Sequence, residues 1–448
     1  MQRNDLDGRS IAVIGSGIAG LTAAYVLSAS NRVTLFEADV RLGGHAHTHL
    51  VDDGRGNPVA VDTAFLVHND RTYPTLCRLF DELGVHTHDT DMSMSVRDDG
   101  IGLQYAGARG LGGLFPSVSN LARPRYLRML FEVKRFHRVA SDLLGFGAPE
   151  NDDHENDETL GAFLDRHGFS AYFVEHFMTP LVAAVWSCAP GEAMRYPARY
   201  LFQFLQHHGM LTVFGSPTWK TVVGGSATYV AAIAERVHEV VLGCPAGSIR
   251  RNEHGVLVTA GDGSPRQFDA AVIATHPDQA LLALAEPTPR ERAILGAIGY
   301  SANHAQLHTD TSLLPTRARA RASWNYLATG GPGKRRDGRS SGPVLVTYDI
   351  SRLMGLTGER RFLVTLGGRD RVDPSTVIAE MIYDHPLYTP ESVAAQRLLP
   401  TLDDDRVVFA GAYHGWGFHE DGAAAGLRAA ERLGARWPTV PEQVTVSC

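Results

Sequence analysis

The sequence predicts an α/β protein in which a Rossmann-like dinucleotide-binding domain is interrupted by an inserted α+β domain. Three features predict this fold. A strand, a glycine-rich turn, a helix and a second strand follow one another within residues 10–37. A similar strand–turn–helix pattern returns at residues 406–434, after a long stretch of different character. At 448 residues the chain is also long for one domain, so two closely packed domains are expected.

The first of these segments has the order of a βαβ unit. Residues 10–14 form a short apolar run, which predicts a buried parallel strand. The sequence LTAAYVLSAS (21–30) predicts a helix, and RVTLFE (32–37) predicts the next strand. Together they place a glycine-rich turn at the carboxyl end of a central strand.

The turn GSGIAG fits the pattern G-x-G-x-x-G. Its first glycine permits a tight turn, its second lets the backbone approach a pyrophosphate, and its third allows close helix–strand packing. Glu37 ends the second strand about 20 residues further on, where a carboxylate can accept the ribose hydroxyls. The alternative is an incidental tight turn; the surrounding strand, helix and acid favour dinucleotide binding. The predicted contacts here are Gly15, Ser16, Gly17, Ile18, Ala19, Gly20, Glu37 and Ala38.

Two further glycine-containing segments favour FAD over NAD. Gly43 and Gly44 follow Glu37 closely and allow a second crossing of the pyrophosphate. Near the carboxyl end, Gly411 precedes a turn that includes Phe418 and leads into a helix. We expect that helix to open near Gly422 and Ala423, with backbone N–H groups aimed at a flavin carbonyl. Two separated contact segments suit an extended FAD molecule.

The pattern along the chain suggests the domain boundaries. Beyond Gly84 the character changes: residues 110–145 have helical spacing and many arginines, 149–158 are acidic, and Thr159 could cap the helix that follows. Residues 330–343 are rich in glycine and charge and predict a loop. We assign the FAD-binding domain to residues 1–75, 215–280 and 400–440, and the substrate or cap domain to residues 76–214 and 281–399.

Composition limits the partners and the compartment. The net charge of −7 provides no bulk positive field for nucleic acid. The four cysteines are far apart and lack a C-x-x-C pair, which indicates reduced thiols. The amino terminus has no apolar signal core, and no uncharged run reaches the roughly 18 residues of a spanning helix. We expect a cytoplasmic protein, with contact at a membrane surface left open.

The sequence resembles the flavin amine oxidase and phytoene desaturase superfamily. It resembles more closely a bacterial group of predicted NAD/FAD-binding proteins that often accompany cyclopropane-fatty-acyl-phospholipid synthase-like methyltransferases. The matching segments are RLGGHAHTH (41–49), VDTAFLVHNDRTYPTLCRLFDELGV (61–85), AAVWSCAPGEAMRYPARYLFQFLQHHGML (183–211), WKTVVGGSATYV (219–230), LHTDTSLLP (307–315), SWNYL (323–327), VTYDISRL (346–353), YDHPLY (383–388) and GAYHGWGFHEDG (411–422).

The resemblance implies a GR2-type FAD-binding fold and further contacts to the cofactor. It implies that Thr63 lies near the flavin and that Ala246 offers its backbone to the adenine. It also implies a lipid-like substrate and a methyltransferase partner. Ala64 stands where a glycine is expected, and Ser351 stands where an asparagine is expected. Both differences concern the substrate and the reaction rather than FAD binding.

Several other residue groups each allow two interpretations. His45, His47 and His49 alternate as metal ligands on a strand would, but a turn beside the FAD pyrophosphate is favoured, and we expect no metal. His419 and Glu420 could transfer a proton, or Glu420 could simply stabilise the start of a helix. The aromatic residues could form a pocket wall or ordinary core; the candidates for the wall are Trp186, Trp324, Tyr326, Trp416 and Phe418.

Residues 121–138 combine basic and apolar side chains with helical spacing. Such a helix can lie on an anionic membrane surface, but the favoured interpretation is a helix of the substrate domain with a solvated arginine face.

We therefore expect an FAD-dependent oxidoreductase that oxidises or desaturates a hydrophobic substrate, plausibly a fatty-acyl or lipid chain. The alternatives are a redox-neutral double-bond isomerase, a flavin amine oxidase, and a non-catalytic FAD- or NAD-binding partner of a lipid methyltransferase. Many amine oxidases of this type place a lysine beside the flavin. The chain has lysine only at Lys134, Lys220 and Lys334, which weighs modestly against amine oxidation.

Overall fold

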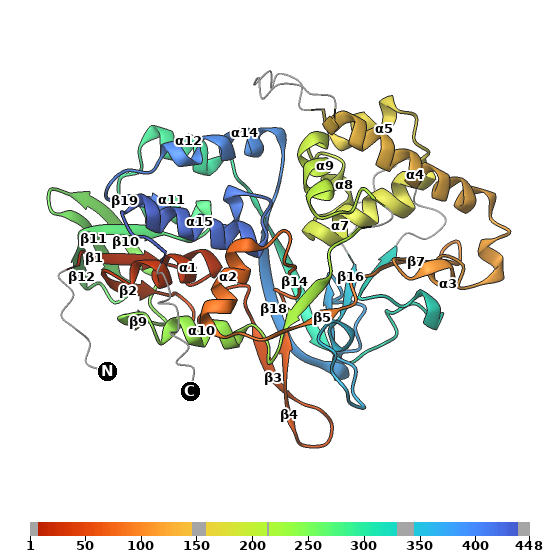
Figure 1. The fold of residues 1–448 in the computed structure, drawn as a ribbon, viewed down its shortest axis with the longest axis horizontal. Coiled ribbons are helices and arrows are strands. Elements are labelled where there is room, and N and C mark those ends of the chain that lie inside the picture. Colours follow the sequence, from red (N-terminus) through yellow and green to blue (C-terminus); the bar gives the residue numbers. More distant parts are fainter. Residues whose placement is uncertain (1–7, 146–157, 213–214, 329–344, 438–448) are drawn as a thin grey trace, which may run out of the picture.

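The computed structural model describes residues 8–145, 158–212, 215–328 and 345–437. Most of the acidic segment 149–158 and all of the loop 330–343 lie outside these ranges. The α/β fold with a Rossmann-like parallel sheet is confirmed, and a second, larger sheet accompanies it (Figure 1). The boundaries between the two domains stay a prediction.

The parallel sheet is assembled from distant parts of the chain. Its five strands run in the order β19-β13-β1-β2-β9, and every neighbouring pair is parallel. Their bounds are Val407–Phe409, Ala270–Ile273, Ser10–Ile14, Arg32–Phe36 and Glu239–Val241. In register, Ile14 lies between Ile273 and Phe36. The strand that precedes the glycine-rich turn is therefore central.

Alternation along the central strand gives the sheet two buried faces. Ile11 and Val13 pack against the helices α1 (Ile18–Leu27), α2 (Pro74–Leu83), α10 (Ala227–Ala234) and α15 (His419–Arg432). Ala12 and Ile14 face the opposite layer. That layer consists of β10 (Ala246–Asn252), β11 (Gly255–Ala260), β12 (Pro265–Phe268), α11 (Pro277–Ala283), α12 (Pro289–Gly296) and α14 (Pro390–Leu398).

The second sheet has seven strands in the order β18-β14-β17-β16-β15-β6-β7. Their bounds are Val377–Pro386, Tyr300–His308, Leu363–Leu366, Val346–Asp349, Trp324–Ala328, Met94–Asp98 and Leu103–Gly107. All pairs are antiparallel except β15 with β6. One end of this sheet therefore reaches toward the parallel sheet through β14 and β18 (Figure 1).

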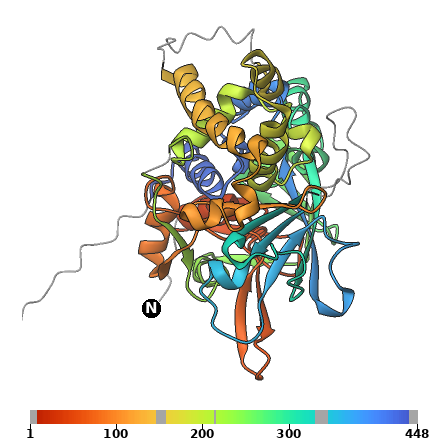
Figure 2. The same ribbon diagram turned by 90° about the vertical axis from the view of Figure 1, so that its right-hand side faces the viewer.

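Helices cover the second sheet at the end far from the parallel sheet (Figure 1). They are α3 (Gly110–Leu114), α4 (Pro124–Gly145), α5 (Leu160–Arg166), α6 (Ala171–Phe173), α7 (Thr179–Trp186), α8 (Pro190–Ala193) and α9 (Ala198–His207). The Thr159 side chain accepts a hydrogen bond from the Ala162 N–H, which confirms the predicted helix cap. Two small sheets, β3 (Thr48–Asp52) with β4 (Pro58–Asp62) and β5 (Thr87–Thr90) with β8 (Trp219–Val222), complete the structure, and the first projects as a hairpin (Figure 2).

Candidate functional site

The glycine-rich turn has the backbone geometry that a dinucleotide site requires. Gly15 has a φ of +96°, which favours glycine. A Cβ on Gly20 would lie 1.9 Å from the carbonyl oxygen of Gly15, so α1 can pack this closely on the turn only because residue 20 has no side chain. By contrast, a Cβ on Gly17 would meet no protein atom within 4 Å. The open space beside Gly17 is what a bound pyrophosphate would need.

Glu37 and Ser16 connect this turn to the second glycine pair. The Glu37 carboxylate accepts hydrogen bonds from the backbone N–H of Ser16 at 2.9 Å and of Asp39 at 2.8 Å. The Ser16 hydroxyl also donates to Glu37, and it accepts a hydrogen bond from the Gly43 N–H at 3.1 Å. The carboxylate is thus fixed at the end of β2, beside the helix N-terminus of α1.

The second glycine pair lies directly opposite the first turn. Gly43 and Gly44 have φ values of +109° and +55°. A Cβ on Gly44 would lie 3.2 Å from the Cα of Gly17, so the two backbone segments face each other across a narrow gap. The backbone N–H donors, and the absence of side chains at these glycines, therefore fit a dinucleotide held between the two backbone segments.

The adenine side of the predicted site lies where the chain passes the end of β2. The Cys244 N–H donates to the Glu37 carbonyl and the Gly243 N–H donates to the Asp39 carbonyl, both at 2.9 Å. Ala38 follows Glu37 in this segment, and Ala246 begins β10 just beyond it. The predicted contacts of Ala38 and Ala246 with the cofactor stay a prediction.

At the flavin end, the carboxyl-terminal helix begins earlier than the sequence predicts. α15 starts at His419, because the Asp421 carboxylate accepts a hydrogen bond from the Phe418 N–H at 2.9 Å. The Gly422 N–H already donates to the Phe418 carbonyl at 3.1 Å, so the helix opens three residues before Gly422. The predicted contacts of Gly411, Phe418, Gly422 and Ala423 with the cofactor stay a prediction. Gly411 lies earlier, between β19 and a short helical turn. Gly422 also packs closely on α1, where a Cβ would lie 2.6 Å from Ile18 Cγ2.

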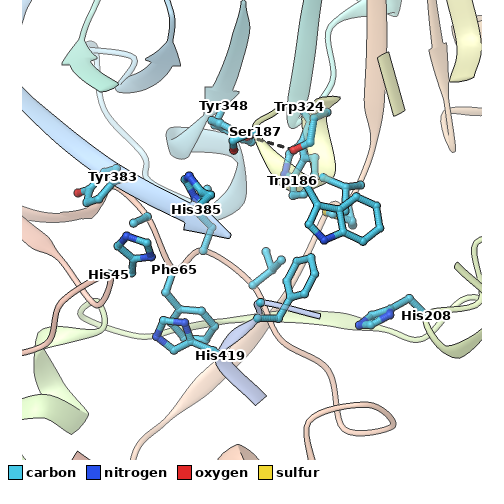
Figure 3. Close-up of a pocket in the computed structure, with 18 of the residues that line it drawn as sticks. His45, Phe65, Trp186, Ser187, His208, Trp324, Tyr348, Tyr383, His385 and His419 are labelled. Carbon is cyan, nitrogen blue, oxygen red and sulfur yellow. Dashed lines mark hydrogen bonds between the residues drawn. The ribbon is translucent and has the colours of Figure 1, made fainter. Parts of the chain in front are cut away.

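A cavity of about 160 Å³ lies between the two sheets, where the flavin end of the site meets the second sheet (Figure 3). Its lining residues are His45, Thr63, Ala64, Phe65, Leu66, Val67, Tyr73, Met92, Ala184, Val185, Trp186, Ser187, Phe204, His208, Met210, Trp219, Trp324, Tyr348, Leu366, Tyr383, His385, Pro386, Gly417, Phe418 and His419. This lining contains no aspartate, glutamate, lysine or arginine.

The polar groups of one cavity wall are mostly histidines. His45 lies beside Tyr383 and His385, with ring centroids 5.1 and 5.3 Å apart. Burial lowers the pKa of His385 to about 4 and that of His419 to about 3. Burial also lowers the pKa of His45 well below its usual range. These imidazoles are therefore uncharged near neutral pH. Thr63, predicted near the flavin, bonds to the Tyr383 hydroxyl at 2.6 Å on the same wall.

The cavity has a second polar region formed by α7, β15 and β16. Figure 3 shows Ser187 and Trp324 near Tyr348 in this region. Ser187 is buried in the left-handed region at a φ of +54°, which is strained for a residue with a side chain. The Tyr348 hydroxyl bonds to the Ser187 side chain and donates to the Ala184 carbonyl. The buried Nε1 of Trp324 has no hydrogen-bond partner among the described residues. A donor is thus available to a ligand oxygen here.

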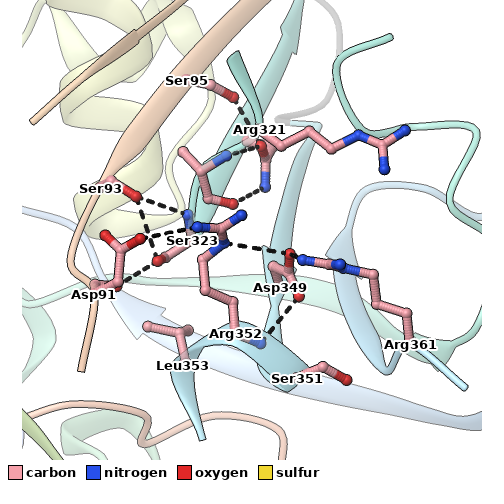
Figure 4. A network of polar contacts seen from close by, with 12 residues as sticks. Asp91, Ser93, Ser95, Arg321, Ser323, Asp349, Ser351, Arg352, Leu353 and Arg361 are labelled. Carbon is pink, nitrogen blue, oxygen red and sulfur yellow. Dashed lines mark hydrogen bonds and ion pairs between the residues drawn. The ribbon is translucent and has the colours of Figure 1, made fainter. Parts of the chain in front are cut away.

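An ionic network around the buried Asp349 supports this second polar region (Figure 4). The fully buried Asp349 follows Tyr348 and is paired with Arg361, while Arg352 lies between Asp349 and Asp91. The Asp349 N–H donates to the Ser323 carbonyl, one residue before Trp324. The network therefore fixes the strand ends that present Trp324 and Tyr348 to the cavity.

Of the two predicted proton-transfer residues, His419 lines the cavity and Glu420 does not. His419 stacks on Phe65 at 3.8 Å, and its Nε2 lies 3.0 Å from the Tyr229 hydroxyl. The Glu420 carboxylate instead accepts hydrogen bonds from the N–H groups of Thr75 and Leu76, at 2.9 and 3.0 Å. Glu420 thus stabilises the start of α2, and the structure does not support its predicted role in catalysis.

Of the other predicted candidates, some line the cavity and others do not. Trp186, Trp324 and Phe418 line the cavity, whereas Tyr326 and Trp416 do not. Ala64 lines the cavity too, while Ser351 does not, and its hydroxyl accepts a hydrogen bond from the Phe362 N–H. The rings of His47 and His49 contact each other, with centroids 4.1 Å apart. Within the described ranges, no group of three or more histidine, cysteine or acidic side chains could hold a metal ion.

Sequence reasoning missed several cavity residues as individual candidates. They are Ser187, Phe204, His208, Tyr348, Tyr383 and His385. All of them lie in segments that carry the resemblance, such as YDHPLY, but no local motif marks which side chains face inward.

Comparison with known proteins agrees with this geometry. Residues 18–434 match the family model "Flavin containing amine oxidoreductase". The chain belongs to this family. The predicted cofactor, FAD, is confirmed by this membership, which also classes the chain among FAD-dependent oxidoreductases. Gly15, Gly17, Gly43 and Gly44, together with Glu37, are the residues that would hold FAD.

The individual relatives of this chain are distant. Polyamine oxidase 5 of Oryza sativa subsp. japonica is 31% identical over 161 residues, which cover 35% of this chain and 30% of the rice protein. The chain thus matches less than a third of that relative. A redesigned putrescine oxidase and a CLA-producing fatty acid isomerase from P. acnes share the fold, each with a TM-score of 0.68 and 16% identity. The first match covers 96% of this chain and 99% of the other, and the second covers 94% and 97%.

Within the described ranges, no helix is both long and apolar enough to cross a membrane.

We predict that Gly17→Ala leaves the fold intact but weakens FAD binding about tenfold or more, because the new Cβ occupies the space reserved for the pyrophosphate. The backbone at Gly17, with φ −61° and ψ 172°, suits alanine, and the Cβ meets no protein atom. Flavin fluorescence titration of the apoprotein measures the affinity, and circular dichroism checks the fold. Gly191→Ala is the control, since its Cβ also meets no protein atom. Wild-type affinity in Gly17→Ala would place the pyrophosphate elsewhere.

We predict that His208 contributes to a loss of stability in acid. Burial lowers its pKa to about 4, below the unfolded value near 6.5, so the unfolded chain binds the extra proton first and stability falls as pH decreases through this window. Between about pH 7.5 and pH 5, the unfolding free energy of the wild type should fall by about 1–2 kcal/mol more than that of His208→Asn. Urea unfolding at both pH values measures this, with the exposed His254→Asn as control. Parallel pH profiles of wild type and His208→Asn would contradict the prediction.

Proposed function

We propose that this protein uses FAD to oxidise or desaturate an uncharged, hydrophobic substrate, such as a fatty-acyl or lipid chain. The observation that carries the proposal is the cavity lining, which is aromatic and aliphatic and has no charged residue. Burial also keeps the pKa values of His385 and His419 far below neutrality. An apolar chain can enter such a cavity without losing strong interactions with water.

The same lining argues against amine oxidation. A protonated amine entering this cavity would find no carboxylate, and burying an unpaired charge is costly. None of the described lysines lines the cavity: Lys220 pairs with Asp70 at 2.6 Å, and Lys134 is exposed on α4. Lys334 lies outside the described residues.

Each part of the cavity has a role in this proposal. Bound FAD supplies an acceptor for the hydride that leaves a substrate C–H bond. The aromatic walls, including Trp186 and Phe418, hold the chain and exclude water. The Trp324 indole N–H donates to an oxygen of the substrate head group. Desaturation also releases a proton, and the uncharged imidazoles of His45, His208, His385 and His419 are lining groups with acceptor nitrogens.

The resemblance to proteins that accompany lipid methyltransferases supports the lipid class of substrate, and it supports a methyltransferase as partner. Both belong to the proposal.

The first test is an anaerobic titration of the FAD-loaded protein with unsaturated and methyl-branched fatty-acyl lipids and with amines. We expect lipids to bleach the flavin absorbance and amines to leave it unchanged, because only an uncharged substrate suits the cavity. Bleaching by amines alone would overturn the proposal. Conversion of a lipid without net bleaching or oxygen use would indicate a redox-neutral isomerase. Flavin that no compound reduces, together with no product, would indicate a non-catalytic FAD-binding protein.

The second test removes the free donor at the polar end of the cavity. Trp324→Phe keeps an aromatic ring but loses the N–H, so the KM for the lipid that bleaches the flavin should rise by about 3–10-fold, the value of one hydrogen bond. Trp219→Phe is the matched control on the same lining. An equal change in both variants would show that ring size, and not the donor, matters.

A further inference from the structure

One outer face of the helical region combines exposed apolar side chains with positive charge. We call it the α4 face and define it by α4 together with α3 and the short helix η1 (Val118–Asn120). In Figure 1, α3 and α4 lie at the end of the molecule farthest from the parallel sheet. We propose that the α4 face docks the protein on a membrane surface of anionic phospholipid. The proposal is independent of the chemistry in the cavity.

The exposed side chains of α4 share one stripe. Arg125, Arg128, Phe131, Lys134 and Arg138 follow one another at intervals of three or four residues, and all five are exposed. The exposed Asp142 continues the stripe four residues after Arg138. The opposite side of the helix is core: Tyr126, Met129, Phe136 and Ala140 are fully buried. Phe131 is 76% exposed between cationic neighbours on both sides, so its position is not explained by packing within the chain.

Further apolar side chains extend the α4 face beyond the helix. Leu111 is 76% exposed, Val118 82% and Leu121 53%. Their segments are held against the start of α4, because the Tyr126 hydroxyl donates to the Leu114 carbonyl at 2.8 Å and the Tyr126 ring contacts Phe115. The result is a set of separate apolar side chains on a rigid support, among arginines. Such a mixture suits the lipid headgroup boundary.

The positive charge of the α4 face favours binding to an anionic surface. Residues 101–138 contain seven basic residues and one acidic residue, although the chain as a whole has a net charge of −7. The acidic residue, Glu132, is only 5% exposed and accepts hydrogen bonds from the N–H and hydroxyl of Ser170. The solvent-facing charges of residues 101–138 are therefore all positive, and the exposed Asp142 adds one negative charge near the end of α4. Lysine and arginine side chains are attracted to an anionic bilayer over a distance of about one Debye length.

The test is co-sedimentation of the FAD-loaded protein with vesicles of phosphatidylcholine alone or mixed with phosphatidylglycerol. We expect binding to the mixed vesicles that weakens as salt is raised, and little binding to phosphatidylcholine. Phe131→Ser should lower the partition coefficient about tenfold. The double variant Arg125→Gln/Arg128→Gln should lower it by about 25-fold, or about fivefold per charge.

Matched controls test whether the effect is specific to the α4 face or follows from removing any exposed apolar or charged side chain. Leu282→Ser removes an apolar side chain that is 83% exposed on α11, and Arg290→Gln/Arg292→Gln removes two exposed charges on α12. Both controls should bind as the wild type does. FAD content and circular dichroism verify that every variant is folded.

Other occupants of the α4 face would be recognised in the same experiments. Equal vesicle binding by the wild type and both test variants, or no binding to the mixed vesicles, would overturn the proposal. Binding to duplex DNA or RNA without binding to vesicles would overturn it in favour of nucleic acid. A dimer in sedimentation analysis that Phe131→Ser dissociates would overturn it in favour of self-association.

Discussion

The close contact between α1 and α15 brings together two ends of the chain that are some 400 residues apart. A Cβ on Gly426 would lie only 2.1 Å from the carbonyl oxygen of Ala19, so the two helices approach backbone to backbone. α1 begins at the pyrophosphate turn, and α15 begins at the turn that borders the cavity. The distance between the nucleotide end and the flavin end of the site is therefore set by this packing. Both turns can serve one extended cofactor only if the contact forms.

Burial determines the chemistry of the cavity. Between the two sheets, desolvation keeps the histidines uncharged and leaves the lining apolar, which disfavours charged substrates. Charges are buried nearby, but they are paired: Asp349 is fully buried and is held by Arg361 and Arg352. Such pairing avoids the large cost of an isolated buried charge. This network also holds the strand ends that carry Trp324 and Tyr348, because the Asp349 N–H donates to the Ser323 carbonyl.

The sequence could predict those structural features that depend only on residues close together in the chain. The strand, the turn at Gly15 and Glu37 form one local unit, so their geometry follows from spacing. The start of α15 was predicted several residues too late, because the bond from Phe418 to Asp421 starts the helix before the run of alanines. Glu420 could not be assigned from the sequence, since its partners lie at the start of α2, more than 300 residues away. The cavity wall from α7, β15, β16 and β18 depends on non-local packing and had no local signal.

The distribution of charge connects the α4 face to the rest of the molecule. Residues 101–138 carry a formal charge of +6, so the remaining residues must carry −13 to give the total of −7. Near an anionic bilayer, the α4 face is attracted while the rest of the molecule is repelled, which favours a single orientation. The apolar side chains then reach the headgroup boundary only in that orientation. A hydrophobic substrate would reside in the same bilayer, so a docked enzyme meets it without first extracting it into water. The charge asymmetry and the uncharged cavity are separate observations, and both point toward lipid.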